Sequence, residues 1–307
     1  MRSNAPFRKG VDLRDNNGIY NYKGRAYPSV TKILEGASNW MFVERAAVQN
    51  EIARLVDMSR EGKLFTRRWV DPDTGVLNEH DCDPLDMLQD GQHIAGAGAR
   101  FLRACADRGT LVHDALELWA SGARWLPTEV ADVVADIRNN RQGDPLTCRD
   151  EDATPYVLSL TNWLRQVSLE VIFAEIPVFS DTHGYAGRLD MIGAVDGKSM
   201  VLDLKTTTSM KRPYIAQSAA YRHADFGVED PGIEVDLSNA LAGEVGVGII
   251  LCGTDRCGLR VVTEAEANAY FHRMFLPALV SWKAGATDES VGDALAMPAA
   301  RAEWVKA

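Results

Sequence analysis

Two aspartates and a lysine fall within neighbouring apolar segments, where charged side chains are unusual. Asp190 lies in the first segment, and Asp203 and Lys205 lie in the second. The dipeptide Asp-Gly separates the segments and favours a tight hairpin turn, so we expect two antiparallel strands, residues 187–195 and 199–206. Because strand side chains alternate between faces, Asp203 and Lys205 leave the same face.

This arrangement has two interpretations, because a charge inside an apolar strand is costly unless it is paired or bound to a metal. One is a structural ion pair of Lys205 with Asp190 or Asp203. The other is a metal site, in which carboxylates bind a hard divalent cation and the ammonium stabilises negative charge on a phosphate. The hairpin alone leaves both interpretations open.

Glu175 interrupts an apolar segment, residues 170–179, that is predicted to be a strand. It is either a third acidic ligand, a partner for Lys205, or a carboxylate that faces water from an edge strand. Pro177 fits an edge strand, because proline cannot donate a hydrogen bond to a neighbouring strand.

Two pairs of polar residues four positions apart lie on predicted helices, and each pair therefore shares one helical face. His113 and Glu117 belong to a helix that ends near residue 120, and Gln217 and Tyr221 belong to a later helix. A lone histidine on such a helix is more often a core or capping residue than a ligand. Gln217 and Tyr221 either hold a phosphate or brace the lysine, and Tyr221 also fits a core position.

These residues lie in four motifs that together resemble the PD-(D/E)xK nuclease superfamily, and within it the RecB-like exonucleases, including those of phages. The motifs in chain order are Gly-x-x-x-His-x-x-x-Glu at 109–117, Gly-x-x-Asp at 187–190, Asp-x-Lys at 203–205 and Gln-x-x-x-Tyr at 217–221. Four motifs in the family's order make the resemblance more specific than any one of them, and it covers roughly residues 100–285.

The resemblance implies an α/β fold with a restriction-endonuclease-like core, in which a central mixed β-sheet is flanked by helices, and a helical N-terminal extension. We therefore expect three regions in this chain. Residues 1–99 would form a hairpin and helical extension packed on the core, residues 100–285 the nuclease core, and residues 286–307 a peripheral C-terminal tail.

The resemblance also implies a site for Mg²⁺ or Mn²⁺. Its metal ligands would be the side chains of His113, Asp190 and Asp203, with the backbone carbonyl of Leu204 as a further oxygen, and Glu117 would orient the imidazole or a water. The imidazole favours Mn²⁺ somewhat. The catalytic residues would be Asp190, Asp203, Lys205, Glu175, Gln217 and Tyr221.

The activity implied is that of a metal-dependent DNA exonuclease, a deoxyribonuclease of phage or bacterial recombination, replication or repair. Its partners would be a linear single- or double-stranded DNA end and a recombination or replication protein. Two alternatives stay open: a structure-selective or restriction-like endonuclease with the same core, and a non-catalytic nucleic-acid-binding module on the same fold. The net charge of −10 argues against binding through a broad basic surface but allows a local basic groove.

Composition places further bounds on the chain. Of the 307 residues, 46% are hydrophobic and 25% charged, as in globular proteins with a sizeable core. We expect no membrane association and a cytoplasmic location (the host cytoplasm if the chain is phage-encoded), because no secretory signal or long apolar run is found. Some RecB-like relatives hold an iron–sulfur cluster through one N-terminal and three C-terminal cysteines. Only Cys252 and Cys257 follow Lys205, so no cluster is expected.

Hydrophobic periodicity and turn residues predict further elements outside the motifs. These are a hairpin over residues 19–27, a helix over 30–35 capped by Ser29, helices over 40–59, 127–140, 154–167 and 264–282, and strands over 244–252 and 258–262. Residues 71–75 are predicted to be a turn cluster and residues 80–83 a solvated loop.

Overall fold

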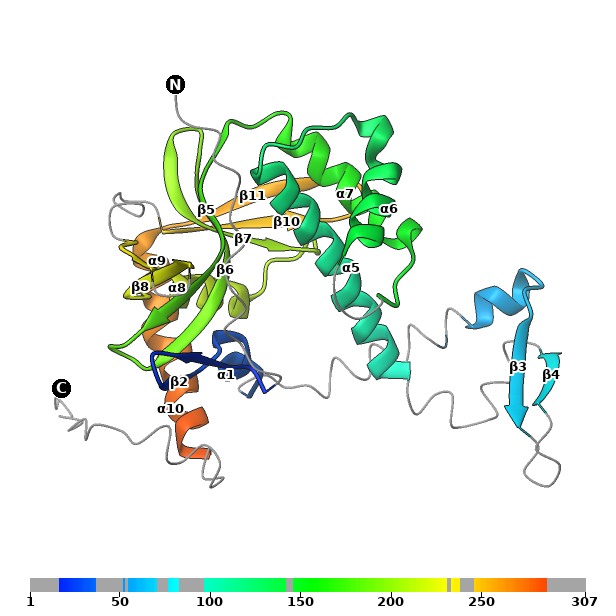
Figure 1. The fold of residues 1–307 in the computed structure, drawn as a ribbon, viewed down its shortest axis with the longest axis horizontal. Coiled ribbons are helices and arrows are strands. Elements are labelled where there is room, and N and C mark those ends of the chain that lie inside the picture. The colour runs from blue at the N-terminus through cyan, green and yellow to red at the C-terminus, as the bar shows by residue number, and fades with distance from the viewer. Residues whose placement is uncertain are drawn as a thin grey trace. The chain divides into compact units, whose positions relative to one another are not determined.

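A seven-stranded mixed β-sheet forms the centre of the larger of two compact units of this chain (Figure 1). The computed structural model describes residues 17–36, 52, 55–70, 77–82, 97–141, 146–230, 233–237 and 246–285. The larger unit comprises residues 1–38, 111–141 and 150–307, and the smaller unit comprises residues 39–110 and 142–149.

The central sheet contains one parallel pair of strands among antiparallel neighbours. In chain order its strands are β5 Leu169–Ser180, β6 Tyr185–Val195, β7 Lys198–Lys205, β8 Phe226–Asp230, β9 Ile233–Val235, β10 Val247–Cys252 and β11 Cys257–Val262. Their spatial order is β11-β10-β7-β6-β5-β8-β9, and the parallel pair is β7 with β10. The chain therefore has the α/β class and the mixed sheet that its sequence predicts.

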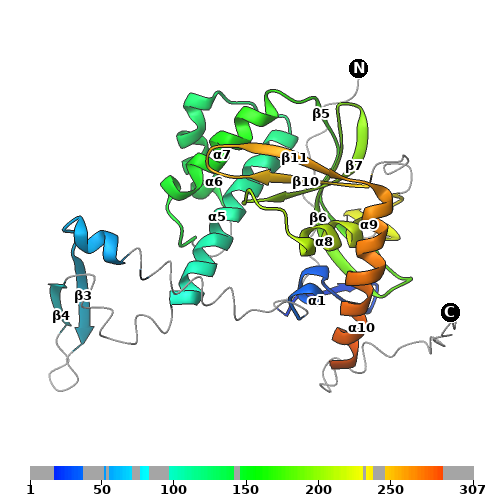
Figure 2. The ribbon, with the colours of Figure 1, turned by 180° about the vertical axis from the view of Figure 1, so that it is seen from behind.

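Helices flank this sheet (Figures 1 and 2). The helices of the chain are α1 Val30–Gly36, α5 Ala97–Ala120, η1 Pro127–Glu129, α6 Val130–Asn140, α7 Asp150–Leu164, α8 Arg212–Arg222, α9 Glu264–Tyr270, the π-helical turn η2 Phe271–Phe275 and α10 Leu276–Gly285. Among the helices in the described ranges, none has the length and apolar character needed to cross a membrane.

Helices α7 and α8 cover opposite faces of the central sheet. Side chains three positions apart on a strand point to opposite faces, and two such residues of β10 contact different helices. Ile249 of β10 is fully buried in the same core cluster as Ile215 and Ala219 of α8. Cys252, three positions along β10, instead donates its S–H to the Tyr156 carbonyl of α7 at 3.2 Å. The apolar run of β10 thus reflects burial on both faces.

The β6–β7 hairpin forms with the turn that the sequence predicts. Val195 pairs with Lys198, and the intervening Asp196 and Gly197 have φ values of 50° and 80°. Positive φ at both central residues is the requirement of a type I′ turn, and Asp-Gly meets it at little steric cost. The hairpin prediction is confirmed, and it fixes the register of Asp203 against the rest of the sheet.

A second hairpin, β1 (Ile19–Tyr22) with β2 (Arg25–Pro28), packs on the central sheet through aromatic rings. The fully buried ring of Phe179 lies at its centre. Its centroid is 4.9 Å from Tyr22, 5.3 Å from Tyr27 and 5.4 Å from Phe226. These contacts join the N-terminal hairpin to strands β5 and β8.

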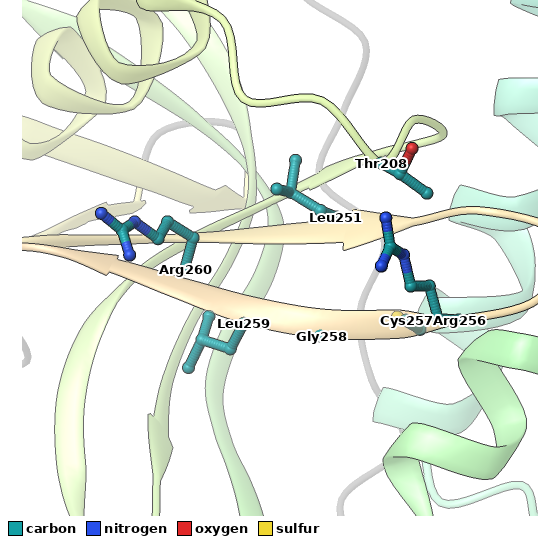
Figure 3. Close-up of a pocket in the computed structure, with 7 residues that line it drawn as sticks. All are labelled: Thr208, Leu251, Arg256, Cys257, Gly258, Leu259 and Arg260. Carbon is teal, nitrogen blue, oxygen red and sulfur yellow. The ribbon is translucent and has the colours of Figure 1, made fainter.

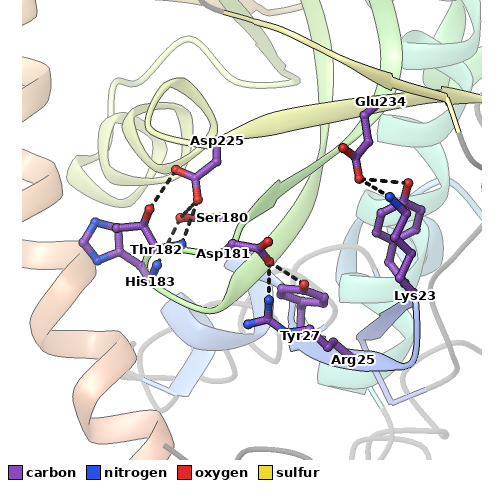
Figure 4. Close-up of polar contacts among 10 residues, drawn as sticks. Lys23, Arg25, Tyr27, Ser180, Asp181, Thr182, His183, Asp225 and Glu234 are labelled. Carbon is purple, nitrogen blue, oxygen red and sulfur yellow. Dashed lines mark hydrogen bonds and ion pairs between the residues drawn. The ribbon is translucent and has the colours of Figure 1, made fainter. Parts of the chain in front are cut away.

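Polar contacts at the same place tie the hairpin to Asp181, in the turn after β5, and to Glu234 of β9 (Figure 4). The Tyr27 hydroxyl donates to Asp181 Oδ1 at 2.6 Å, and burial with this bond raises the pKa of Tyr27 to about 12. Lys23 Nζ pairs with Glu234 Oε1 at 2.7 Å, and the Tyr22 hydroxyl donates to the same oxygen at 3.3 Å. Exposed pairs of this kind add little stability, so the aromatic packing dominates.

The cap of α1 is also confirmed. The backbone N–H of Lys32 donates to Ser29 Oγ at 3.2 Å, at the start of the helix that the sequence places over residues 30–35. A serine at this position satisfies one of the amide groups that the first helical turn leaves without a partner.

Several elements differ from the sequence predictions. Strands β3 (Phe65–Val70) and β4 (Leu77–Cys82) form an antiparallel hairpin, so the prediction of a solvated loop at 80–83 is wrong for the residues in β4. Strands β8 and β9 were not predicted, because their short segments show no clear alternation. The predicted helix 264–282 contains the π turn η2. Most of residues 40–59 and all of 286–307 lie outside the described residues.

The region boundaries at residues 99 and 285 stay predictions. The hairpin β1–β2 and α1 belong to the same compact unit as the sheet, while residues 39–110 belong to the smaller unit.

We predict that Phe179→Ala lowers the free energy of unfolding by about 3–5 kcal/mol, because a buried ring is replaced by a cavity. Urea denaturation followed by circular dichroism measures this change. Val280→Ala is the control, since Val280 is 67% exposed and its change is expected to stay within about 0.5 kcal/mol. Equal stability of the two variants would contradict the role given to Phe179.

Candidate metal centre

Three side chains from three separate elements meet at the middle of the β5–β6 pair. His113 comes from α5, Glu175 from β5 and Asp190 from β6, and one potential ligand atom of each lies within 4.8 Å of the others. His113 Nδ1 is 3.3 Å from Asp190 Oδ2. All three side chains are partly buried, so their charges are only partly screened by water.

The backbone of β5 is distorted at the acidic member of this group. Ala174 pairs with Met191 and Ile176 pairs with Leu189, so the register sets Glu175 opposite Asp190. Glu175 has a φ of 50°, which for a residue other than glycine costs about 1–3 kcal/mol. Such backbone strain is concentrated at functional sites, and here it accompanies the approach of two carboxylates.

The side chains of the neighbouring strand β6 do not alternate regularly beside Glu175. Leu189 and Ile192, which are three residues apart, both pack in the core cluster against α8. In a regular strand they would point to opposite faces. The side-chain alternation of β6 is therefore broken between Leu189 and Ile192, next to Asp190 and the distorted backbone of Glu175. Both apolar side chains remain in the core.

Asp190 also joins β6 to β7. The ladder between these strands ends at Met191 and Leu202, and beyond it the Leu204 N–H donates to Asp190 Oδ2 at 2.7 Å. The carboxylate thus takes the place of a backbone acceptor where the strands separate. The amide of Leu204 positions the predicted ligand Asp190, while the ligand role predicted for the Leu204 carbonyl stays a prediction.

The electrostatics of the group favour a cation. Burial raises the pKa of Glu175 to about 8, with the negative charge of Asp190 acting in the same direction and the Arg188 guanidinium opposing both. The charge of Glu117 adds to the effect, which places this carboxylate near the group, as its helical spacing predicts. Two carboxylates and an imidazole form a donor set that suits Mg²⁺ or Mn²⁺.

Asp203, the other predicted carboxylate ligand, lies outside this group of three and next to Lys205. Asp203 is 1% exposed, and its Oδ2 is 2.7 Å from Lys205 Nζ. The contact is an ion pair whose angles fall short of a hydrogen bond. Burial raises the pKa of Asp203 to about 6, against the opposing charge of Lys205.

The lysine keeps its proton in this environment. Burial lowers the pKa of Lys205, but the charges of Asp203 and Asp190 outweigh burial, so its pKa lies above the ordinary value. Lys205 Nζ is also 5.4 Å from the centre of the Tyr214 ring, within the range of a cation–π contact. The ammonium is therefore held as a cation beside the acidic group.

Gln217 and Tyr221 contact each other, as their spacing on α8 predicts. Gln217 Nε2 donates to the Tyr221 hydroxyl at 2.9 Å. Tyr221 is 2% exposed, and its ring lies so close to Gly187 that a Cβ there would be 2.4 Å from Cε1. Burial raises the pKa of Tyr221 well above its ordinary value, and the catalytic roles predicted for Gln217 and Tyr221 stay predictions.

Two residues near the group, Arg188 and Tyr214, are not among the site residues that the sequence predicts. Arg188 acts on the pKa of Glu175, and Tyr214 contacts Lys205. Strand alternation could have indicated Arg188, which lies two positions before Asp190. No comparable pattern points to Tyr214, because its contact with Lys205 depends on where α8 packs.

Comparison with known proteins finds no matching family model and no significantly similar curated protein. An assignment of function therefore depends on the geometry of this site and on the motifs of the sequence.

We predict that Lys205→Met lowers the free energy of unfolding by about 3–5 kcal/mol, because it leaves the buried Asp203 charge without a partner. Replacing both residues, as Asp203→Leu with Lys205→Met, is expected to recover most of this loss. Urea denaturation in the presence of a chelator measures both changes. Lys198→Met, at the exposed start of the same strand, is the control and is expected to have little effect. A single variant as stable as the control would refute the ion pair.

Proposed function

We propose that this chain is a metal-dependent deoxyribonuclease of the RecB-like exonuclease type, built on a restriction-endonuclease-like core. The observation that carries the proposal is the meeting of His113, Glu175 and Asp190 beside Lys205. His113, Asp190 and Lys205 lie in three of the family's motifs in order, and Glu175 joins them from a strand outside those motifs, 62 positions after His113. A structural ion pair would need no such convergence.

In the proposed site, His113, Glu175 and Asp190 hold Mg²⁺ or Mn²⁺, and Asp203 and the Leu204 carbonyl are candidates for further ligands. When bound, the cation supplies Lewis acidity toward the scissile phosphate and toward the attacking water. The Leu204 N–H orients the Asp190 carboxylate at 2.7 Å.

Lys205 has a separate role in the proposal. Its ammonium stabilises the negative charge that accumulates on the phosphate as the phosphodiester bond breaks. Asp203 holds the ammonium in place through their 2.7 Å contact and keeps it protonated. Gln217, bonded to Tyr221 on α8, would hold a phosphate oxygen or brace Lys205.

We predict that Glu175→Gln and Asp190→Asn each lower the rate of DNA cleavage by at least about a hundredfold, because each removes a proposed ligand. The assay follows labelled linear DNA with Mg²⁺, Mn²⁺ or a chelator. Glu170→Gln is the matched control, an exposed carboxylate on the same strand that is expected to keep full activity. Cleavage that persists in both site variants, or in the chelator, would refute the proposal.

The substrate form distinguishes an exonuclease from an endonuclease with the same core. An exonuclease needs an end, so we expect loss of linear DNA while covalently closed circular DNA remains intact. Nicking of the circle would instead assign the site to an endonuclease. Metal binding without cleavage of either substrate would favour a non-catalytic nucleic-acid-binding module.

We also predict that Glu175→Gln and Asp190→Asn weaken Mn²⁺ binding at least about tenfold, as the loss of a charged oxygen ligand should. Isothermal titration calorimetry with MnCl₂ measures the affinity without a nucleic acid. Glu170→Gln again serves as the control. Unchanged affinity in both site variants would place the metal elsewhere.

A further inference from the structure

A cleft of about 260 Å³ opens between the β10–β11 hairpin and the loop that follows Lys205 (Figure 3). Its walls include Thr208 from that loop, Leu251 from β10, and Arg256 and Arg260 from the β11 side. Sites for drug-sized ligands have volumes of roughly 300–1,000 Å³, so this cleft suits a smaller group.

The register of the sheet sets this cleft on the same face as Lys205. Leu251 pairs with Lys205 on one side and with Gly258 on the other, and paired residues project to the same face. Arg260, two positions after Gly258 on β11, therefore also belongs to this face, and Arg256 lies in the turn just before β11. Figure 3 shows both guanidinium groups on the side of Leu251.

Gly258 keeps the space between the two arginines open. A Cβ added at Gly258 would meet no atom within 4 Å, and the residue has no positive φ that would require glycine. The backbone would therefore accept a larger residue, and its side chain would project between Arg256 and Arg260. The glycine leaves a gap flanked by two cations.

The two guanidinium groups are exposed and have no ion pair or side-chain hydrogen bond within the described part of the chain. Such cations stand out in a chain whose net charge is −10. Guanidinium groups bind phosphate oxygens through two parallel hydrogen bonds, and the Thr208 hydroxyl offers a further donor. The chemistry of the cleft therefore matches a phosphate group.

Two lysine side chains lie close to one aromatic ring of α8. Lys211 Nζ lies 5.9 Å from the centre of the Tyr214 ring, and Lys205 Nζ lies 5.4 Å from the same centre. Neighbouring strands are about 4.8 Å apart, so β11 lies about 10 Å from β7 across the sheet. Lys205, at the end of β7, and the cleft on β10 and β11 are therefore about two strand spacings apart on one face of the sheet.

We propose that the Arg256–Arg260 cleft binds backbone phosphates of the nucleic-acid strand on one side of the scissile phosphate. This inference rests on the proposed function and names the residues that hold the substrate. A phosphate-tracking row of cations binds all sequences alike and gives affinity a strong dependence on salt. Contacts on one side of the metal centre would also fix the direction in which a strand enters.

The test measures binding of a fluorescent single-stranded oligonucleotide in a chelator, at several KCl concentrations. For Arg256→Ala with Arg260→Ala we expect about tenfold weaker binding and a salt slope lower by about 1.4, roughly 0.7 for each lost contact with a single-strand phosphate. Lys198→Ala is the control, because Lys198 is exposed at the opposite end of β7. It removes one positive charge and is expected to leave affinity and slope unchanged.

Gly258→Glu tests the cleft without removing an arginine. The new carboxylate would pair with Arg256 and Arg260, so we expect binding to weaken about as much as in the double arginine variant. Gly258→Ala adds volume without charge, and its loss should be at least about fivefold smaller, since charge-assisted contacts dominate phosphate binding. This pair of variants keeps the test decisive if the arginine variant folds poorly.

Mn²⁺ titration of the same variants separates this inference from the proposed function. We expect unchanged Mn²⁺ affinity in all of them, because none alters His113, Glu175 or Asp190. Oligonucleotide affinity and salt slope that match the wild type in the arginine and Gly258→Glu variants would overturn the inference while leaving the nuclease proposal intact. Binding of inorganic phosphate but not of the oligonucleotide would also overturn it, as a site for free phosphate.

Discussion

The carboxylate of Asp190 is the interaction on which the rest of the candidate site depends. It accepts the Leu204 N–H at 2.7 Å where the β6–β7 ladder ends, and it lies 3.3 Å from His113 Nδ1. On its other side the sheet register sets Glu175 opposite it. One side chain therefore joins a helix and three strands, and a partly buried charge of this kind needs such partners to be tolerated.

Negative and positive charges are kept in separate places around this carboxylate. Burial raises the pKa of Glu175 to about 8, and the negative charge of Asp190 acts in the same direction. Asp203 instead neutralises Lys205 in the interior. The proposed metal cation and the Lys205 ammonium would then act on one phosphate from two directions. The metal would keep Glu175 and Asp190 as ligands, and Lys205 would keep Asp203 as its partner.

The parallel pairing of β7 with β10 explains why the cleft lies where it does. The two strands end side by side, with Lys205 paired to Leu251, and the loops that follow them leave the sheet at the same edge. Ligand sites in α/β proteins are commonly found beyond the carboxyl ends of parallel strands. Here the edge carries Lys205, then Thr208, then Arg256 in the β10–β11 turn and Arg260 on β11. The antiparallel β11 extends the same face outward by one strand.

The sequence by itself determined the elements that depend on local rules. Strand alternation and the Asp-Gly turn predicted the hairpin that carries Asp203 and Lys205 on one face, and helical spacing predicted the contact of Gln217 with Tyr221. These features depend on residues a few positions apart, so periodicity and turn chemistry suffice.

Only the tertiary structure decided how distant segments meet. The left-handed φ of Glu175 and its place opposite Asp190 depend on the pairing of β5 with β6. The cleft formed by Arg256, Gly258 and Arg260 faces Lys205's side of the sheet only because β10 pairs with β7 in one register. A shift of one residue would turn these side chains to the other face, and no local pattern fixes that choice.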